Sequence, residues 1–325
     1  MKKIVITGAT GAIGRALITE AIQSGYEVLA VVHRSSGRAE RLDKIRNCSV
    51  LRLDLSEYKN AIEEMEIQGL TANYDIFFHL AWEAPFGNGR NNYELQLNNV
   101  QAAIDAVDFA KKLGCQVFVG TGSQAEYGRV ERTIESDKNS IGHSFSSVQD
   151  SLLLRSNTPT NPETGYGIAK LCAGQMTRLA AEQYGMKHIW TRILSVYGPH
   201  DRAETLISTA VSKMLRNEKT EFSPCEQIWD YLYEEDAARA LLLAGEKGIH
   251  GKNYVVGSGE AHPLRWYIEK IAEITGYRKD IGFGRRPYND KQVMHLVADI
   301  SELEGDTGFR PKVDFETGIR EMISV

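Results

Sequence analysis

Several residue types that would mark a specialised class of protein are scarce in this sequence. The 325 residues include only 4 cysteines and 8 prolines, and Asp and Glu (43) outnumber Lys and Arg (38). The formal net charge of -5 provides no overall positive field for attracting nucleic acid or an anionic membrane. We therefore expect neither as a partner, and any anionic ligand must be bound by a few local groups.

The sequence also lacks the spacing of a metal or disulfide framework. Its cysteines are far apart, at Cys48, Cys115, Cys172 and Cys225. We expect free, mostly buried thiols and no metal site. No stretch approaches the run of about 20 apolar residues that a membrane-spanning helix needs. The apolar run in Met1–Gly8 is too short for a signal peptide, so we expect a cytoplasmic protein.

Short β-branched runs alternate with longer amphipathic stretches along the first 200 residues. This alternation predicts an α/β fold, a doubly wound parallel sheet of six or seven strands with helices on both faces. The expected strands are 4–7, 28–32, 50–53, 76–80, 117–119 and 189–194. The stretches between them that we expect to be helical or amphipathic are 13–24, 38–46, 98–113 and 166–184.

The pattern changes after residue 200. Helical stretches at 206–216, 235–245 and 266–275 are separated by short strand-like pieces, which predicts a smaller mixed α/β domain. We place the cofactor-binding domain at 1–200 and the second domain at 201–325, with about 229–246 able to return to the first. A polar segment, 129–161, interrupts the first domain and is expected to form an inserted loop.

A glycine-rich turn follows the first expected strand, in the sequence Thr7–Gly14. Glycines spaced by three residues let the backbone turn tightly and approach a pyrophosphate at a helix N-terminus. The strand before and the helix after it predict dinucleotide binding, although an ordinary tight turn would use the same residues. The expected cofactor contacts in this turn are Gly8, Thr10, Gly11, Ala12 and Ile13.

The end of the second expected strand bears on the choice of cofactor. An acidic residue there usually binds the ribose of NAD, but this chain has His33 and Arg34, with Arg38 following. A guanidinium is suited to a 2′-phosphate, which favours NADP over NAD, unless the arginines are solvated surface charges. Asp54, with Leu55 beside it, is a candidate for the adenine amine or for a helix cap.

Tyr166 and Lys170 are spaced to share one face of a helix. An ammonium beside a phenol would lower the phenol pKa and favour proton exchange with a sugar hydroxyl. Such a pair is common by chance, so its weight comes from Ser123, which follows an expected strand just after Thr121. Ser123 would hydrogen-bond the substrate oxygen beside Tyr166, or would serve only as a turn hydroxyl.

Together these residues resemble the extended short-chain dehydrogenase/reductase superfamily, in its nucleotide-sugar epimerase, dehydratase and reductase branch. The resemblance covers nearly the whole chain. It rests on the glycine turn, His79-Leu80-Ala81, Asn99-Val100, Ser123 before Tyr127-Gly128, Pro162 to Lys170, Arg192 to Pro199, Asp230-Tyr231 with Glu235-Asp236-Ala237, and Gly308-Phe309-Arg310-Pro311.

The resemblance implies a Rossmann-type fold with a nucleotide-sugar-binding domain and a role for each matching residue. Tyr166 would be the acid/base, Lys170 would bind the nicotinamide ribose, and Ser123 would orient the reacting C–O group. Leu80, Ala81, Asn99 and Thr121 would contact the cofactor. The expected substrate contacts are Trp82, Ser123, Gln124, Tyr197, Trp229 and Arg286. Family members often dimerise through two helices per subunit, here 98–113 and 166–184, so we expect a homodimer.

Departures from the family pattern help to choose the reaction. The 4,6-dehydratases carry an Asp-Glu pair where this chain has Gln124 and Ala125, which disfavours dehydration. Glu126 comes one residue later and should point elsewhere. Trp229 replaces a common phosphate-binding arginine and offers a stacking surface. The segment 129–161 is longer than usual and is expected to shape substrate specificity.

These observations predict a NADPH-dependent 4-keto reductase acting on a nucleotide-activated hexose. A 4-epimerase that retains NAD is the main alternative. A non-catalytic NADP-binding protein is a second alternative, which the presence of both Tyr166 and Lys170 disfavours.

Overall fold

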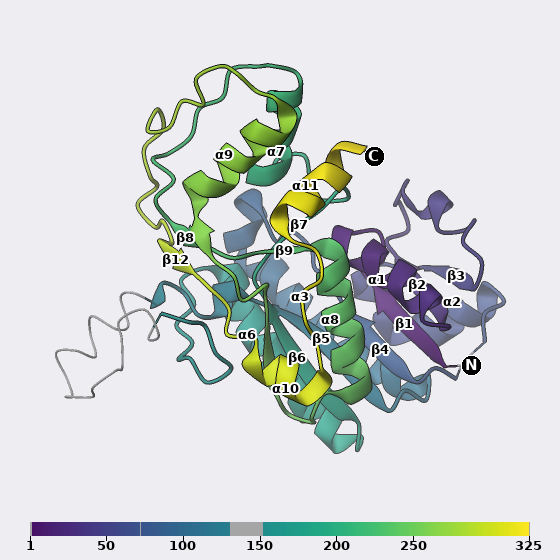
Figure 1. Ribbon diagram of the computed structural model, residues 1–325. Helices are drawn as coiled ribbons and strands as arrows, with labels where there is room; N and C mark the ends of the chain where they lie inside the picture. The colour runs from purple at the N-terminus through teal and green to yellow at the C-terminus, as the bar shows by residue number, and fades with distance from the viewer. Residues whose placement is uncertain (1, 72, 131–151, 325) are drawn as a thin grey trace, which may run out of the picture.

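The computed structural model describes residues 2–71, 73–130 and 152–324. A parallel sheet of seven strands forms its centre, in the order β10-β6-β5-β4-β1-β2-β3 (Figure 1). The strands are β1 (Lys3–Thr7), β2 (Glu27–Val32), β3 (Cys48–Arg52), β4 (Ile76–His79), β5 (Val117–Ser123), β6 (Lys187–Ile193) and β10 (Asn253–Val256). The predicted doubly wound parallel sheet is confirmed.

Helices cover both faces of the sheet, so alternate residues of one strand enter different cores. Ile4 and Ile6 of β1 pack with helices α1 and α8, whereas Val5 packs with α3 and the end of α6. These helices are α1 (Ala12–Gln23), α3 (Tyr93–Lys112), α6 (Gly165–Gln183) and α8 (Glu234–Lys247). The short helix α2 (Ala61–Ile67), which the sequence did not predict, packs in the same core as Val5.

The strand order reverses direction between β1 and β4. From β1 the chain continues outward through β2 and β3, and it then returns to β4 on the other side of β1. Ligands of such sheets bind at the carboxyl ends of the strands where the order reverses. The glycine turn after β1 and Leu80-Ala81 after β4 meet at this position.

The C-terminal part of the chain contributes to both halves of the molecule. Helix α8 packs on α1, and β10 pairs with β6, so 234–256 belongs to the central sheet and its helical layer. A separate core lies among α7 (Leu206–Leu215), α9 (Leu264–Thr275) and α11 (Phe315–Ser324), in the upper part of Figure 1. Small sheets join β8 (Ile228–Trp229) to β11 (His262–Pro263) and β12 (His295–Leu296), and β7 (Ser195–Tyr197) to β9 (Tyr231–Tyr233); α10 (Ser301–Thr307) packs on α8.

Two buried carboxylates fix the C-terminal segments to the sheet. Asp230 accepts hydrogen bonds from the backbone N–H groups of Ser258, Gly259 and Ala298. Asp236 accepts from the N–H of Lys312 and Val313. A buried carboxylate is tolerated only when such donors surround it, so both acids of this motif have structural roles.

Two sequence expectations have a different outcome. The stretch 38–46 forms no α-helix and contains only the 3₁₀ helix η1 (Ala39–Arg41). Its apolar residues Ala39, Leu42 and Ile45 recur every three positions, which is the period of a 3₁₀ turn. They pack in the core that contains Ile4 and Ile6 of β1. The expected inserted loop 129–161 lies mostly outside the described residues.

All four cysteines are free, and Cys115 and Cys225 are buried whereas Cys172 is exposed. Within the described ranges, no group of three or more His, Cys, Asp or Glu side chains is placed to hold a metal ion. No helix among these residues is long and apolar enough to cross a membrane.

Candidate active site

A crevice with two halves runs along the carboxyl ends of the central strands. One half is a cavity of about 800 Å³ at the ends of β1, β2 and β3, and the other is a cavity of about 520 Å³ at the ends of β1, β5 and β6. Gly8 and Trp82 line both cavities. The two halves therefore meet at the glycine turn, as a ligand with two nucleoside ends would require.

The glycine turn is too tightly packed for a side chain at Gly8 or Gly14. Gly8 has a φ of +69°, and a Cβ atom there would lie 2.8 Å from the backbone N of Ala81. A Cβ atom on Gly14 would lie 2.3 Å from the carbonyl oxygen of Gly8. Gly11, Ala12 and Ile13, at the start of α1, line the smaller cavity, and Thr10 lines the larger one. This cradle fits the pyrophosphate of a dinucleotide.

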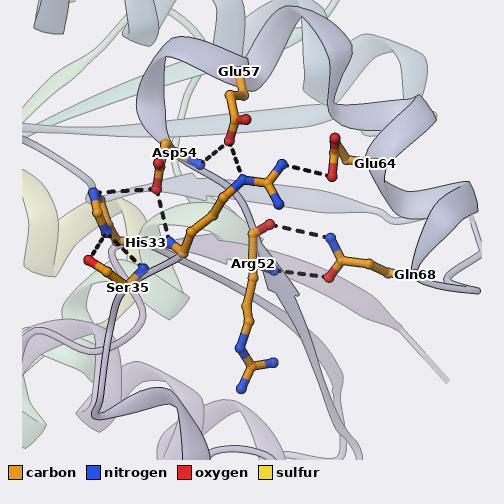
Figure 2. Close-up of polar contacts among 8 residues, drawn as sticks. His33, Ser35, Arg52, Asp54, Glu57, Glu64 and Gln68 are labelled. Atoms are coloured by element: carbon orange, nitrogen blue, oxygen red, sulfur yellow. Dashed lines mark hydrogen bonds and ion pairs between the residues drawn. The ribbon is translucent and has the colours of Figure 1, made fainter.

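His33, Asp54 and Leu55, three of the predicted cofactor contacts, line the larger cavity. The Asp54 Oδ1 atom accepts a hydrogen bond of 2.9 Å from the Arg34 backbone N–H and lies 3.3 Å from His33 Nε2 (Figure 2). Asn99 lines the same cavity, and its side-chain amide forms two hydrogen bonds of 2.9 Å with the backbone of Glu83. Asn99 therefore also fixes the loop after β4.

The sequence predicts that Arg34 contacts the cofactor, but in the structure Arg34 does not line the larger cavity. Its Nε atom lies 2.7 Å from Glu57, and its Nη2 atom lies 2.8 Å from Glu64 (Figure 2). Two carboxylates therefore hold the guanidinium that was expected to meet a 2′-phosphate. Arg38, the other arginine after β2, lines the smaller cavity beside the start of α1.

The three residues expected to be catalytic are brought together. Ser123 ends β5, and Tyr166 and Lys170 lie in the first turns of α6, after the Thr164 cap. A Cβ atom on Gly167 would lie 2.3 Å from the Ala125 carbonyl oxygen, so α6 starts close to the Ser123 turn. All three line the smaller cavity, and the Ser123 hydroxyl lies close enough to the Tyr166 phenol to act on its pKa.

Lys170 is buried, and its ammonium group is held away from the phenol. Its Nζ atom donates a 2.7 Å hydrogen bond to the carbonyl oxygen of Thr121 and lies 3.9 Å from the centre of the Trp82 ring. It is 5.9 Å from the centre of the Tyr166 ring. Burial lowers the pKa of Lys170 to about 7, although Glu126 partly opposes this effect.

The pKa of Tyr166 is raised, contrary to the lowering expected from Lys170. Burial of the phenol is the largest cause. The nearby Ser123 hydroxyl and the positive charge of Arg90 act in the opposite direction, whereas the Glu126 carboxylate adds to the rise. The geometry explains the difference, since the nearest cation over the Tyr166 ring is Arg90 and not Lys170.

Glu126 points into the protein, away from the substrate side. It is fully buried and lies 2.8 Å from the Arg192 Nε atom. It also accepts hydrogen bonds from the Trp190 indole N–H (3.1 Å) and from the Ser123 backbone N–H (2.8 Å). Glu126 therefore fixes the Ser123 turn against β6.

The expected substrate contacts have mixed outcomes. Trp82 and Gln124 line the smaller cavity with Ser123. Tyr197 does not line it, because this side chain is buried in the C-terminal core with its hydroxyl directed at backbone carbonyls. Trp229 supports the cavity indirectly by donating a 2.8 Å hydrogen bond to Ser195, which does line it. Arg286 lies exposed on a loop and does not line this cavity.

Sequence reasoning missed several cavity residues that come from loops. They are Phe86, Arg90, His200, Asp201 and Arg202. None of them belongs to a motif with regular spacing, and their positions depend on loop paths that local periodicity does not encode. The structure alone therefore shows that the charged side chains of Arg90, Asp201 and Arg202 line the same cavity as Tyr166.

Residues 4–257 match the model of the NAD dependent epimerase/dehydratase family. The chain belongs to this family. The resemblance to the extended short-chain dehydrogenase/reductases is thereby confirmed. Among the curated relatives of this epimerase/dehydratase chain is the dTDP-4-dehydro-6-deoxyglucose reductase of Escherichia coli, which is 25% identical and covers 98% of this chain and 96% of the relative.

Further proteins similar to this family member are named for other reactions. The dTDP-glucose 4,6-dehydratase of Salmonella typhimurium is 24% identical over 99% of this chain and 91% of its own length. The crystal structure of UDP-glucuronic acid 4-epimerase from Bacillus cereus in complex with NAD has a TM-score of 0.76 at 19% identity, covering 99% of both chains. These likenesses support the fold and leave the reaction to be decided from the site.

Proposed function

We propose that this enzyme transfers a hydride between a nicotinamide cofactor and a carbon of a nucleotide-activated hexose. The observation that carries the proposal is that Ser123, Tyr166 and Lys170 line one cavity together with the glycine turn. Ser123 would hold the reacting oxygen, and Tyr166 would exchange its proton. Residues 201–325, apart from the stretch that joins the sheet, would bind the nucleotide sugar.

We propose reduction of a 4-keto sugar as the reaction. The Tyr166 phenol is protonated at neutral pH, since its pKa is raised and not lowered, so a proton is available for a ketone oxygen. A bound NADPH would supply the hydride to the carbonyl carbon. Dehydration is disfavoured because Gln124 and Ala125 occupy the positions where the dehydratases carry acids.

The cofactor is proposed as NADP, with NAD as the alternative. His33 lines the larger cavity, and Arg38 lines the smaller one. Both side chains offer donors for a 2′-phosphate. The ion pairs of Arg34 with Glu57 and Glu64 support the alternative, because they remove one guanidinium from this role. A retained NAD would in turn support 4-epimerisation.

The proposal is tested by mixing the purified protein with NADPH and a 4-keto-6-deoxyhexose attached to UDP, dTDP, CDP or GDP. A thermal-shift panel selects the nucleotide, because a bound ligand raises the apparent stability. We expect NADPH to be oxidised in amounts equal to the 4-hydroxy sugar formed. NAD released from the denatured protein, together with no oxidation of NADPH, would establish the epimerase and contradict the reductase.

We also propose that the protein is a homodimer formed through α3 and α6. These helices pack side by side and expose large apolar side chains on the outer surface, namely Tyr93, Leu97, Ile168, Met176 and Leu179. Ile168, Met176 and Leu179 recur on one face of α6, as a helix-to-helix contact requires. Light scattering should give twice the mass of the chain, and Leu179→Glu should give the monomer mass. A monomeric parent protein would contradict this proposal.

A further inference from the structure

Arg90 occupies an unusual position over the ring of Tyr166. It belongs to the 3₁₀ helix η3 (Gly87–Asn91), in the loop between β4 and α3. The central carbon of its guanidinium lies 4.5 Å from the centre of the Tyr166 ring, and its Nη1 atom donates a 2.7 Å hydrogen bond to the Pro85 carbonyl oxygen. Arg90 also lines the smaller cavity. Its positive charge is therefore directed at both the phenol and the substrate space.

The guanidinium of Arg90 has no acidic partner in the described part of the chain. Its one polar contact there is the bond to Pro85, and no carboxylate pairs with it. The contrast with Arg34 is direct, because two carboxylates neutralise that arginine. A partly buried guanidinium without a counter-ion is free to stabilise negative charge that forms nearby.

The loop that carries Arg90 is tied to the helices on either side of it. The Gln96 side chain of α3 donates a 3.0 Å hydrogen bond to the Gly89 carbonyl oxygen. The Gly165 backbone N–H, at the start of α6, donates a 2.9 Å bond to the Asn91 side chain. Arg90 is thus positioned relative to Tyr166 by contacts that need no bound ligand, which is a requirement for electrostatic preorganisation.

Three charged side chains lie near Tyr166 among the residues that the structure describes, and a fourth is paired with one of them. Arg90 comes from η3, Lys170 from α6 itself, Glu126 from η4 (Gln124–Glu126), and Arg192 from β6, where it pairs with Glu126. Helix α3 contributes the uncharged Gln96, through its bond to Trp82. Lys170 is held by Thr121 and Trp82, so Arg90 is the nearer of the two cations over the phenol ring.

We propose that Arg90 is a positioning residue that acts through Tyr166: its guanidinium stabilises the negative charge formed on the phenol during proton transfer. The sequence spacing instead predicts this role for the Lys170 ammonium. In the proposed reduction, a hydride supplied by the reduced nicotinamide cofactor would add to the carbonyl carbon, and the carbonyl oxygen would take the Tyr166 proton. The C=O group would become C–O–H, the oxidised cofactor would leave, and the phenolate would regain a proton from solvent. The inference rests on the proposed role of Tyr166.

The test compares Arg90→Met with Arg90→Lys. Charge within about 4–6 Å shifts a pKa by one or more units, so Arg90→Met should raise the pKa of Tyr166 by about one unit. A weaker acid donates its proton more slowly, so kcat should fall about tenfold or more while KM changes little. Arg90→Lys keeps the charge and should recover part of both effects.

The titration is read without turnover by placing 3,5-difluorotyrosine at position 166 and recording ¹⁹F NMR spectra against pH. The fluorines lower the phenol pKa into a range where the protein stays folded. The matched control is Arg202→Met, because Arg202 lines the same cavity but lies 5.0 Å over the Phe86 ring instead. Arg202→Met should leave the titration at position 166 unmoved.

Two outcomes would overturn the inference. The first is an unchanged titration at position 166 in Arg90→Met, with thermal unfolding like that of the parent. The second is a rise in KM alone, which would make Arg90 a ligand for a substrate anion. The NMR result decides the electrostatic role even if no nucleotide sugar is reduced, so failure of the proposed function is distinguishable from failure of this inference.

Discussion

Replacing Tyr166 with phenylalanine is expected to lower kcat by about 10²–10⁴-fold, the usual contribution of a positioned general acid. The substitution removes only the hydroxyl, which lies near Ser123, and it keeps the ring that contacts Trp82 and Arg90. Cofactor binding should therefore persist, because the glycine turn and the larger cavity are untouched. Steady-state kinetics and a fluorescence titration with NADPH measure the two effects separately.

The matched control for this substitution is Tyr184→Phe. Tyr184 follows the end of the same helix, is 40% exposed, and donates a 2.8 Å hydrogen bond to Asp108 far from the crevice. It should leave kcat unchanged. A Tyr166→Phe enzyme with the parent kcat would remove the acid/base role from this residue, and the proposed reaction would lose its proton donor.

Glu126→Leu is expected to destabilise the fold by about 3–5 kcal/mol, because it leaves the Arg192 guanidinium buried without its counter-ion. The same change also removes the acceptor for the Ser123 backbone N–H and for the Trp190 indole. Urea unfolding followed by circular dichroism measures the loss. The double variant Glu126→Leu/Arg192→Met should recover most of the stability, since no buried charge then remains.

The control for this pair is an ion pair of the same chemistry at the surface. Arg178 and Glu182, four residues apart on α6, lie 2.8 Å from each other with side chains 54% and 38% exposed. Glu182→Leu should change the free energy of unfolding by no more than about 1 kcal/mol. An effect of Glu126→Leu as small as this would show that the buried network contributes little to the fold.

The parts of the site that follow regular geometry were predictable from the sequence. The glycine turn could be located because its strand and helix have clear periodicities on either side, and close packing around Gly8 and Gly14 leaves space for no other residue. Tyr166 and Lys170 share a helix face because four residues span about one turn. The meeting of α6 with the Ser123 turn required the family resemblance as well.

The remaining residues depend on which neighbours they find in space. The Arg34 side chain is of a type that often binds phosphate. In the structure, however, Glu57 and Glu64, from later elements of the chain, pair with its guanidinium. Tyr197 lies in a family motif, yet its hydroxyl points to the backbone of Asp314 and Phe315, more than a hundred residues away. No local pattern encodes such long-range contacts.

Trp82 stands where the two halves of the crevice meet, with its indole N–H bonded to Gln96 and its ring beneath the Lys170 ammonium. A perturbation of this ring from the adenosine half would be transmitted to Lys170, and the reverse also holds, because thermodynamic coupling between two sites is reciprocal. We therefore expect cofactor preference and catalytic pH dependence to be coupled through Trp82. An engineer who alters one through Trp82 should expect the other to change with it.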